Sequence, residues 1–221
     1  MFLFINKPKN ITSHDVVNKI RRITAQRRVG HGGTLDPNAT GLIIVAIGRD
    51  STKKLDMFTK GMDKTYEAEI ILGEERNTDD AEGKVMRKSA KIPTKNNIDN
   101  ILEKYTGEIL QLPPDFSAIK KNGKKAYELA RLGKNVDLAP RKIVVKKAVL
   151  KEYNYPRIKV VFEVSSGTYI RALARDIGRE LGAFGYLNNL KRTKVGKFSL
   201  NRAVDLDNLN SSNWENYAIE I

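Results

Sequence analysis

The apolar and polar positions of the first third of the chain predict a strand, a helix and a second strand. Residues 2–6, of which the first four are apolar, predict a strand. Ser13 can then cap a helix from Asp15. After a basic, glycine-containing loop at residues 26–37, the β-branched run 42–47 predicts a buried strand. The apolar residues of the helix recur at helical spacing and would share one face: Val16, Val17, Ile20 and Ile23.

The rest of the chain alternates expected helices with expected strands. Ser51 opens a short helical turn, and strands are expected at residues 66–72 and 159–165. Between these strands the sequence indicates an acidic loop at 74–83 and helices around 98–105 and 124–132. A last helix is capped by Thr168 and stops at Gly182, with an apolar face made of Ile170, Leu173, Ala174, Ile177 and Leu181. These patterns predict an α+β fold with one extended core and no linker between domains.

The composition supports a folded protein and adds a strong positive charge. Of the 221 residues, 40% are hydrophobic and 7% are aromatic, which is enough to build a core. The 40 Lys and Arg residues outnumber the 26 Asp and Glu residues, so the formal net charge is +14. Such a charge favours a nucleic-acid partner over a merely solubilising surface or an anionic membrane. The basic residues cluster at three places: Arg21, Arg22, Arg27 and Arg28; residues 120–125; and residues 191–197.

Residues that the sequence lacks exclude several classes of protein. There is no cysteine, so no disulfide and no thiolate metal site can form. The two histidines, His14 and His31, are too few for a multi-histidine metal centre, and we expect no metal and no cofactor. The longest apolar run, residues 42–47, is far shorter than the roughly 18 residues of a membrane-spanning helix. The apolar start of the chain is too short for a signal peptide, so we expect a cytoplasmic protein with no membrane contact.

The densest signal for chemistry is the segment RVGHGGTLDPNATGLIIVAIG, residues 28–48. Glycines and a proline surround His31, a threonine and Asp36 just before the expected strand. We therefore expect a rigid loop whose side chains have fixed directions. Pro37 biases Asp36 toward an extended backbone, so the carboxylate is not on a helix. On this loop alone, a catalytic Asp36 and a turn-forming Asp36 are equally good interpretations. The segment lacks a phosphate-loop pattern, and the acidic loop 74–83 lacks calcium-ligand spacing.

A second signal is SSGTYIRALARDIG, residues 165–178, where Tyr169 and Arg171 stand in the first turn of a helix. An arginine near the positive end of a helix dipole is favourable only beside an anion, which suggests a partner such as Asp36. The alternative is an arginine exposed on the first turn. A third signal, DKTYEAEI, places Tyr66 at the start of an alternating strand, where a core role is more common than base stacking.

Together these segments resemble the TruB family of tRNA pseudouridine synthases, over residues 3–206 and in the family's order. The opening INKPKNITSHDVV has Asn10 where the family usually has glycine, and the loop GHGGTLDPNATG has Gly32 where threonine is common. The GHGGTLDP form is more similar to the stand-alone bacterial type than to the RNA-guided relatives. The other matching segments are KTYEAEI, GEERNTDDAEG, LPPDFSAIKKNGKKAYELARLG, GTYIRALARDIG and LNNLKRTKVGKF.

The resemblance implies a pseudouridine-synthase fold, with a mixed, mostly antiparallel central sheet flanked by helices and loops. It implies an isomerase that converts uridine to pseudouridine at position 55, in the T loop of tRNA, with a catalytic aspartate and a flipped base. The implied partner is the T arm of tRNA. The resemblance implies no DNA partner and no cofactor, and an enzyme that acts as a monomer.

The resemblance also implies roles for the residues of the three signals. Asp36 matches the catalytic aspartate, either as a nucleophile at C1′ or as a base at C2′, and the sequence does not separate these two routes. Arg171 would hold Asp36 in its ionised form. Tyr66 matches the tyrosine that stacks on the target base, and Tyr169 matches the one near its reactive edge.

Four further residues match positions that contact the nucleotide in the family. His31 matches the residue that fills the space left by the flipped base, and Leu190 matches a residue that lines the base pocket. Lys53 and Lys64 match family lysines, for which we expect contacts to phosphates.

The resemblance divides the chain into a catalytic domain at residues 1–205 and a short C-terminal tail at residues 206–221. We expect Trp214 to pack this tail down. Family members usually continue into an RNA-binding domain of PUA type, and we expect no complete domain of that type here.

Two other functions remain open at this point. A protein of the same fold could bind or fold RNA without catalysis, although it would not need to keep Asp36, Arg171 and both tyrosines. A carboxylate-dependent N-glycosidase acting on nucleic acid would need a path for water and a second acid. It would release free uracil, so analysis of the product separates it from an isomerase.

Overall fold

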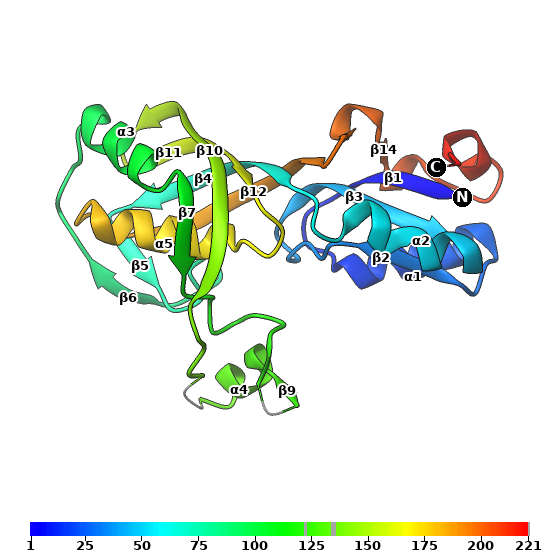
Figure 1. The fold of residues 1–221 in the computed structure, drawn as a ribbon, viewed down its shortest axis with the longest axis horizontal. Helices are drawn as coiled ribbons and strands as arrows, with labels where there is room; N and C mark the ends of the chain where they lie inside the picture. The colour runs from blue at the N-terminus through cyan, green and yellow to red at the C-terminus, as the bar shows by residue number, and fades with distance from the viewer. Residues whose placement is uncertain (122, 134–135, 221) are drawn as a thin grey trace. The chain divides into compact units, whose positions relative to one another are not determined.

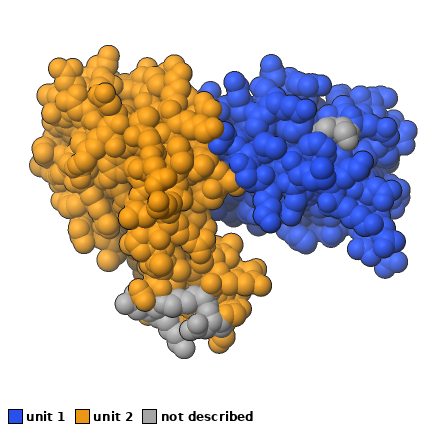
Figure 2. Space-filling model, viewed as in Figure 1, with its two compact units in different colours: residues 1–67, 190–221 blue, residues 68–189 orange. Residues whose placement is uncertain are grey.

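The computed structural model describes residues 1–121, 123–133 and 136–220, so residue 122 of the basic cluster 120–125 lies outside the described residues. The chain divides into two compact units, drawn as a ribbon in Figure 1 and coloured separately in Figure 2. Unit 1 contains residues 1–67 and 190–221, and unit 2 contains residues 68–189. Strands β4 (Lys64–Leu72) and β12 (Gly185–Val195) contribute residues to both units. The fold is α+β with a mixed sheet, as predicted.

Unit 1 is built on mixed β-structure. Besides parts of β4 and β12, its strands are β1 (Phe2–Lys7), β2 (Val29–Gly32), β3 (Thr40–Ile47), β13 (Phe198–Ser199) and β14 (Val204–Asp205). They lie in the order β14-β1-β3-β12, with β2 also paired to β3 and β13 to β12. β1 and β3 are antiparallel, whereas β14 is parallel to β1 and β12 is parallel to β3. The strands predicted at residues 2–6 and 42–47 are confirmed.

β2 lies inside the segment 26–37, which the sequence pattern predicts as a loop, so that prediction is wrong for this part. Glycine weakens a strand signal, and two of the four residues of β2 are glycines. At Gly32 the missing side chain has a packing reason, because a Cβ there would lie 2.2 Å from Thr59 Cγ2. The buried Thr59 side chain occupies the space that a larger residue at position 32 would need.

Helices α1 (Ser13–Thr24) and α2 (Arg49–Thr59) cover opposite faces of this sheet. Successive side chains of a strand point to opposite faces, so Leu3 and Ile5 of β1 pack in the hydrophobic cluster that includes α1. Phe2 and Phe4 pack instead in the cluster that includes Leu55 of α2. Because both faces are buried, β1 and β3 are continuous apolar runs in the sequence. α2 begins before Ser51 and is longer than the short turn predicted there.

The N-cap of α1 is Thr12, so the prediction that Ser13 caps the helix is wrong. Thr12 Oγ1 accepts a hydrogen bond from the Asp15 N–H at 3.0 Å, and the Asp15 carboxylate accepts one from the Thr12 N–H at 2.8 Å. These reciprocal bonds form a capping box. Ser13 is the first residue of the helix, and its hydroxyl bonds to Leu35 instead. The predicted apolar face is confirmed, with Val16, Val17 and Ile20 buried and Ile23 packed against them.

The C-terminal segment folds back onto unit 1. Ile219 bridges to Phe2 of β1, whose N–H donates to the Ile219 carbonyl at 2.8 Å. Leu206, Leu209 and Trp214 are buried in the same cluster as α1, which confirms the packing predicted for Trp214. Three 3-10 helices shape this segment: η1 (Leu200–Arg202), η2 (Leu206–Asn208) and η3 (Trp214–Tyr217).

Unit 2 holds the remaining strands. Its sheet adds β11 (Arg157–Val164), β10 (Arg141–Asn154) and β7 (Gly107–Gln111) to β4, in the order β12-β4-β11-β10-β7. The strands predicted at 66–72 and 159–165 are confirmed as β4 and β11, whereas β7, β10 and β12 were not predicted. Two short hairpins are made of β5 (Glu74–Arg76) with β6 (Val85–Lys88), and of β8 (Lys120–Lys121) with β9 (Lys124–Lys125). β5 replaces part of the predicted acidic loop.

The helices of unit 2 are α3 (Lys95–Lys104), α4 (Ala126–Arg131) and α5 (Ile170–Glu180). α4 begins later than predicted because Lys124 and Lys125 belong to β9. The predicted apolar face of α5 is buried throughout. Its N-cap is Tyr169 and not Thr168, whose hydroxyl donates to the Ser165 carbonyl at 2.9 Å. Gly182 follows the helix with φ +67°, as its predicted stop.

The capping assignment predicts different outcomes for two neighbouring substitutions. Thr12→Ala should lower the free energy of unfolding by about 1 kcal/mol, because the Asp15 N–H loses its capping oxygen. Ser13→Ala should lower it by a similar amount through the loss of the bonds to Leu35. Only Ser13→Ala should also speed hydrogen exchange at the Leu35 N–H. Urea unfolding and exchange followed by NMR measure both effects, and faster Leu35 exchange in Thr12→Ala would contradict the assignment.

Candidate functional site

Asp36 lies in the loop of residues 33–39, called the Asp36 loop below, which connects β2 to β3 in unit 1. Its side chain is exposed, whereas Leu35 and Ala39 are buried. The Asp36 carbonyl accepts a hydrogen bond from the Ala39 N–H at 3.0 Å, which closes a turn around Pro37. The loop therefore presents an exposed carboxylate on an anchored backbone.

Ser13 and Lys7 hold the middle and the end of the Asp36 loop. The Ser13 hydroxyl donates to the Leu35 carbonyl at 3.0 Å and accepts from the Leu35 N–H at 2.9 Å. Lys7, at the end of β1, donates from Nζ to the Pro37 carbonyl at 3.0 Å. The Asn10 N–H donates to the same carbonyl at 2.9 Å. These contacts fix the backbone on both sides of Asp36.

Arg192 of β12 holds the first part of the Asp36 loop. Its guanidinium donates to the carbonyls of Gly33 at 2.9 Å and Thr34 at 3.4 Å, and its Nε donates to the carbonyl of Leu42 in β3 at 2.8 Å. The side chain is among the most deeply buried of the described residues. The loop is therefore held by side chains from α1, β1 and β12.

Lys7 is a fully buried cation whose Nζ is satisfied by backbone carbonyls. Besides Pro37 it donates to Ile11 at 2.7 Å and to Pro8 at 2.9 Å. Burial lowers the pKa of Lys7 from 10.5 to about 8. The nearby Asp36 carboxylate acts to raise this pKa, and the charge of Arg192 acts to lower it. Lys7 and Asp36 are thus close enough to influence each other electrostatically.

Lys64 is a second buried lysine beside the loop. It opens β4, and its Nζ donates to the Met62 carbonyl at 2.8 Å. Burial lowers the pKa of Lys64 to about 8, and the charge of Arg192 lowers it further. A Cβ at Gly33 would lie 3.4 Å from Arg192 Nη1 and 3.6 Å from Lys64 Cε, so both cations flank the start of the Asp36 loop. Gly33 has φ +75°, which also favours glycine there.

His31 lies half-buried in β2, just before the Asp36 loop. Its Nδ1 is buried, and no described group forms a hydrogen bond with that atom. Burial lowers the pKa of His31, and the charges of Arg192 and His14 lower it further, so the ring is neutral at pH 7. A neutral ring is compatible with the space-filling role that the resemblance implies.

The other predicted residues of unit 1 lie on three different elements. Tyr66 is buried in β4. Leu190 is half-buried in β12, and its carbonyl accepts a hydrogen bond at 3.3 Å from Thr40 Oγ1, where β3 begins. Lys53 is exposed on α2. The structure thus gathers Lys64, Leu190 and His31 beside the Asp36 loop or its ends, whereas Lys53 lies on a helix of the opposite face from α1.

Tyr169 and Arg171 belong to unit 2. The side-chain amide of Gln111 in β7 forms two hydrogen bonds with the Tyr169 backbone. It accepts from the Tyr169 N–H at 2.9 Å and donates to the Tyr169 carbonyl at 3.0 Å. Arg171 is only 7% exposed, so the alternative of an exposed arginine is wrong. The predicted pairing of Arg171 with Asp36 joins residues of the two units and stays a prediction.

Arg171 has partners within unit 2 that the sequence did not reveal. Its Nη1 lies 3.3 Å from the Asp80 carboxylate and donates to the Thr78 carbonyl at 3.3 Å, while Nη2 donates to the Phe116 carbonyl at 3.2 Å. Three arginines at four-residue spacing on α5 form ion pairs with the acidic segment: Arg171 with Asp80, Arg175 with Asp79 and Arg179 with Glu75. This spacing, opposite an acidic segment, is the signal that could have identified Asp80.

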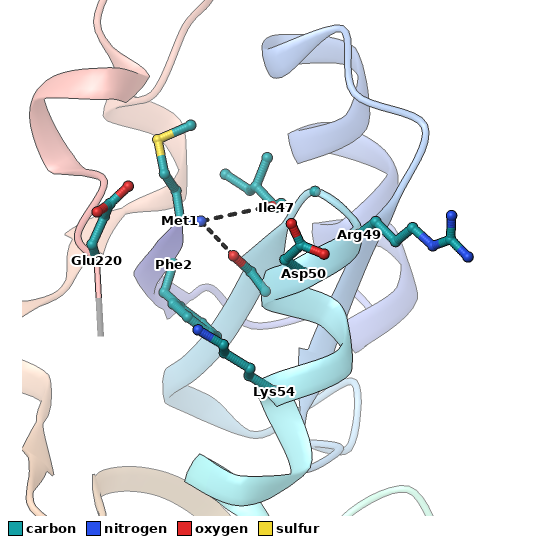
Figure 3. Close-up of a pocket in the computed structure, with 9 residues that line it drawn as sticks. Met1, Phe2, Ile47, Arg49, Asp50, Lys54 and Glu220 are labelled. Carbon is teal, nitrogen blue, oxygen red and sulfur yellow. Dashed lines mark hydrogen bonds between the residues drawn. The ribbon is translucent and has the colours of Figure 1, made fainter.

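Within the described ranges, no group of three or more His, Cys, Asp or Glu side chains could hold a metal ion. Nor does any described helix have the length and apolar character to cross a membrane. A pocket of about 310 Å³ in unit 1 is lined by Met1, β3 and α2 residues and Glu220, and contains none of the predicted site residues (Figure 3). The chemistry available around the Asp36 loop is that of a carboxylate among buried cations.

The sequence of this chain matches known protein families. Residues 21–170 match the model of the TruB family pseudouridylate synthase N-terminal domain, and residues 171–220 match that of the tRNA pseudouridylate synthase B C-terminal domain. A tRNA pseudouridine synthase B from Mycobacterium tuberculosis is 48% identical over 210 residues, which cover 93% of this chain and 70% of that protein. The one from Dehalococcoides mccartyi is 46% identical over 211 residues, covering 95% and 70%.

Solved structures share the fold. The structure of an H/ACA RNP bound to a substrate RNA containing 2′-deoxyuridine includes a chain similar to this one, with a TM-score of 0.72 and 25% identity. A Cbf5-Nop10-Gar1 complex gives a TM-score of 0.73 and 26% identity. This chain is covered to 99% in both comparisons but spans only 56% of each of those chains.

The buried lysines predict an unusual dependence of stability on pH. Folding lowers the pKa of Lys7 from 10.5 to about 8, so between these pH values the folded chain binds fewer protons than the unfolded chain. The contribution of Lys7 to the free energy of unfolding should therefore rise with pH across that window. Urea unfolding of wild type and Lys7→Met at pH 7.5 and 9.5 should show the stability difference shifting toward wild type by about 1–2 kcal/mol. Lys54→Met, at an exposed position of α2, controls for the loss of a charge, and an unchanged difference would contradict the prediction.

Proposed function

The chain belongs to the TruB family of pseudouridylate synthases, which are isomerases, and we propose that it isomerises the uridine at position 55, in the T loop of tRNA, with Asp36 as catalytic carboxylate. One observation carries the proposal. Asp36 is exposed on a loop whose backbone is held by Ser13, Lys7 and Arg192, as a reactive carboxylate must be. A turn-forming aspartate would not need three buried anchors from three elements.

The proposed reaction rearranges one bond without redox change or net hydrolysis. The bond between N1 of uracil and C1′ of ribose breaks, the base turns in the pocket, and C5 bonds to C1′. C5 then loses its proton to solvent and N1 takes up a proton, so the product has the same mass as uridine. The protein must supply a carboxylate at the ribose, a pocket for a detached base, and a way to extract the nucleotide from its stack. Asp36 serves as the nucleophile at C1′ or as the base at C2′, since an ionised carboxylate is competent in both routes.

Three other residues have surroundings that fit their proposed roles. We assign to Arg171 the stabilisation of the ionised carboxylate; its guanidinium is buried and already oriented by Asp80. Tyr66 stacks on the target base, and Tyr169, whose backbone is gripped by Gln111, lies near the reactive edge.

Four further residues contact the target nucleotide or the RNA around it in this proposal. The neutral ring of His31 fills the space left by the flipped base, and Leu190 lines the base pocket. Lys64 and Lys53 contact phosphates of the RNA. Lys64 carries a pKa lowered to about 8 by burial, so a nearby phosphate would favour its charged form.

The proposed partner is the T arm of tRNA, bound by a monomer in the cytoplasm. A formal net charge of +14 favours an RNA backbone, and the homologues are tRNA pseudouridine synthases. The T loop is folded and displays unstacked bases, which is the kind of RNA feature that proteins read specifically. The exposed basic residues then add affinity that falls as salt rises.

Asp36→Asn should keep the fold and the affinity for RNA but abolish detectable turnover. The amide is nearly isosteric with the carboxylate, yet it is neither a nucleophile nor a base. Release of tritium from C5-labelled uridine in tRNA measures turnover, and a filter-binding assay measures affinity. Turnover by Asp36→Asn within about tenfold of wild type would refute the assignment.

Analysis of the reaction products, by mass and nucleoside composition, separates the proposed isomerase from its two rivals. Wild-type protein should yield RNA of unchanged mass that contains pseudouridine. Free uracil with an abasic site would instead indicate an N-glycosidase, and unmodified RNA under tight binding would indicate a binding protein without catalysis.

A comparison of RNA substrates tests the proposal that the enzyme acts on the T loop. An isolated T-arm stem-loop should be isomerised with a kcat/KM within about tenfold of whole tRNA, a gap of no more than about 1.4 kcal/mol in transition-state binding. An anticodon stem-loop of equal length with a loop uridine is the matched control and should react at least about 100-fold more slowly. Equal rates on the two stem-loops would refute the T-loop assignment.

A further inference from the structure

Arg192 is deeply buried, and no acidic side chain in the described part of the chain pairs with it. Its side chain is 1% exposed, and its guanidinium forms all of its hydrogen bonds with the carbonyls of Gly33, Thr34 and Leu42. No carboxylate forms an ion pair with it among the residues that the structure describes. Buried charges in proteins are usually paired with an opposite charge, because removing them from water is costly.

The neighbourhood of Arg192 adds to this cost rather than relieving it. The charge of Arg192 lowers the pKa values of Lys7, Lys64 and His31, so these groups lie within its electrostatic reach. A neutral side chain in its place would remove this repulsion. A hydrogen bond from a charged donor to a carbonyl is stronger than one from a neutral donor. The buried guanidinium therefore holds three carbonyls more strongly than a neutral side chain could.

Those carbonyls mark the two ends of the chain segment that carries Asp36. Gly33 and Thr34 stand three and two residues before Asp36, and Leu42 stands six residues after it, in β3. The planar fork of an arginine can reach both ends at once, whereas a lysine is a point donor. Arg192 therefore ties the start of the Asp36 loop to the strand that follows it.

The backbone is shaped to allow this reach. Arg192 of β12 pairs with Gly41 of β3, which has φ +100°. A Cβ at Gly41 would lie 2.3 Å from the Arg192 carbonyl oxygen, so only glycine permits the two strands to approach this closely. The close approach brings the Arg192 side chain over β3 to the loop.

We propose that Arg192 is a positioning residue for the reaction, which holds the Gly33 and Thr34 peptides so that the Asp36 carboxylate stays in its reactive orientation. The proposal rests on the catalytic role given to Asp36. Lys7 holds Pro37 independently of Arg192, so loss of Arg192 loosens the Gly33 and Thr34 peptide groups and leaves the second half of the loop attached. The expected defect is therefore in turnover and not in RNA binding.

Two substitutions test this role through kinetics on tRNA. Arg192→Lys keeps the charge but not the fork, and should lower kcat by about tenfold or more with KM within about threefold of wild type. Arg192→Ala should lower kcat by about 100-fold and leave a cavity that methylguanidinium can enter. Added methylguanidinium, kept well below denaturing concentration, should then restore kcat by about tenfold or more. Arg202→Ala in η1, an exposed arginine of the same unit, is the matched control and should show neither the loss nor the rescue.

A second readout does not depend on any activity. The Leu35 N–H belongs to the same peptide group as the Thr34 carbonyl that Arg192 holds, and its exchange should be at least about tenfold faster in Arg192→Lys than in wild type. The Ala39 N–H, in the second half of the loop, should exchange at its wild-type rate. Amides of α5 in unit 2 provide the internal reference for global unfolding. Should Arg192→Ala fail to fold, Arg192→Lys decides the question through kcat and exchange together.

The outcomes separate this proposal from the proposed function. A normal kcat in Arg192→Lys, a loss confined to KM, or a folded Arg192→Ala that methylguanidinium does not rescue would each overturn the positioning role. Unchanged exchange at Leu35 would overturn it too. If wild type makes no pseudouridine, the proposed function fails, while the exchange measurement still shows whether Arg192 orders the loop.

Discussion

The structure of unit 1 depends on how the backbone carbonyls around Asp36 are held. The loop must leave one carboxylate exposed while its own peptide groups stay fixed, and a loop supplies no regular hydrogen-bond ladder for that purpose. Two buried cations, Lys7 and Arg192, and the Ser13 hydroxyl take over the role of a ladder. Burying these cations is unfavourable, as the pKa of Lys7 lowered to about 8 shows, so the order that they give the loop must offset it.

This requirement explains why the sheet of unit 1 is arranged as it is. β1 ends at Lys7, α1 begins at Ser13 and β12 carries Arg192, so three elements from distant parts of the sequence each deliver one anchor. The parallel pairing of β12 with β3 places Arg192 opposite Gly41, close to where the loop enters β3. The apolar clusters on the two faces of the sheet keep these strands in register, and the register sets the positions of the anchors.

The sequence predicts the parts of this structure that depend on local pattern. The apolar runs of β1 and β3, the face of α1 and the face of α5 follow from periodicity, and each is confirmed. Local patterns do not predict which partner a polar side chain bonds when near and distant groups compete for it. Ser13 looks like a cap, but Leu35 competes for its hydroxyl, and the adjacent Thr12 takes the cap instead. The partners of Arg192 and Arg171 lie 55 to 159 residues away in the chain, beyond the reach of any local pattern.

In unit 2, Arg171 is oriented by the same kind of interaction, hydrogen bonds that involve backbone carbonyls. Arg171 is held by Asp80 and by the carbonyls of Thr78 and Phe116, just as the Asp36 loop is held by groups of its own unit. Within each unit, a group proposed for the reaction is held by its own surroundings: the Arg171 side chain by Asp80 and two carbonyls, and the backbone around Asp36 by Ser13, Lys7 and Arg192. Little conformational entropy of these held groups therefore remains to be lost when the reaction begins. Such preorganisation is how a protein stabilises developing charge without rearranging during the reaction.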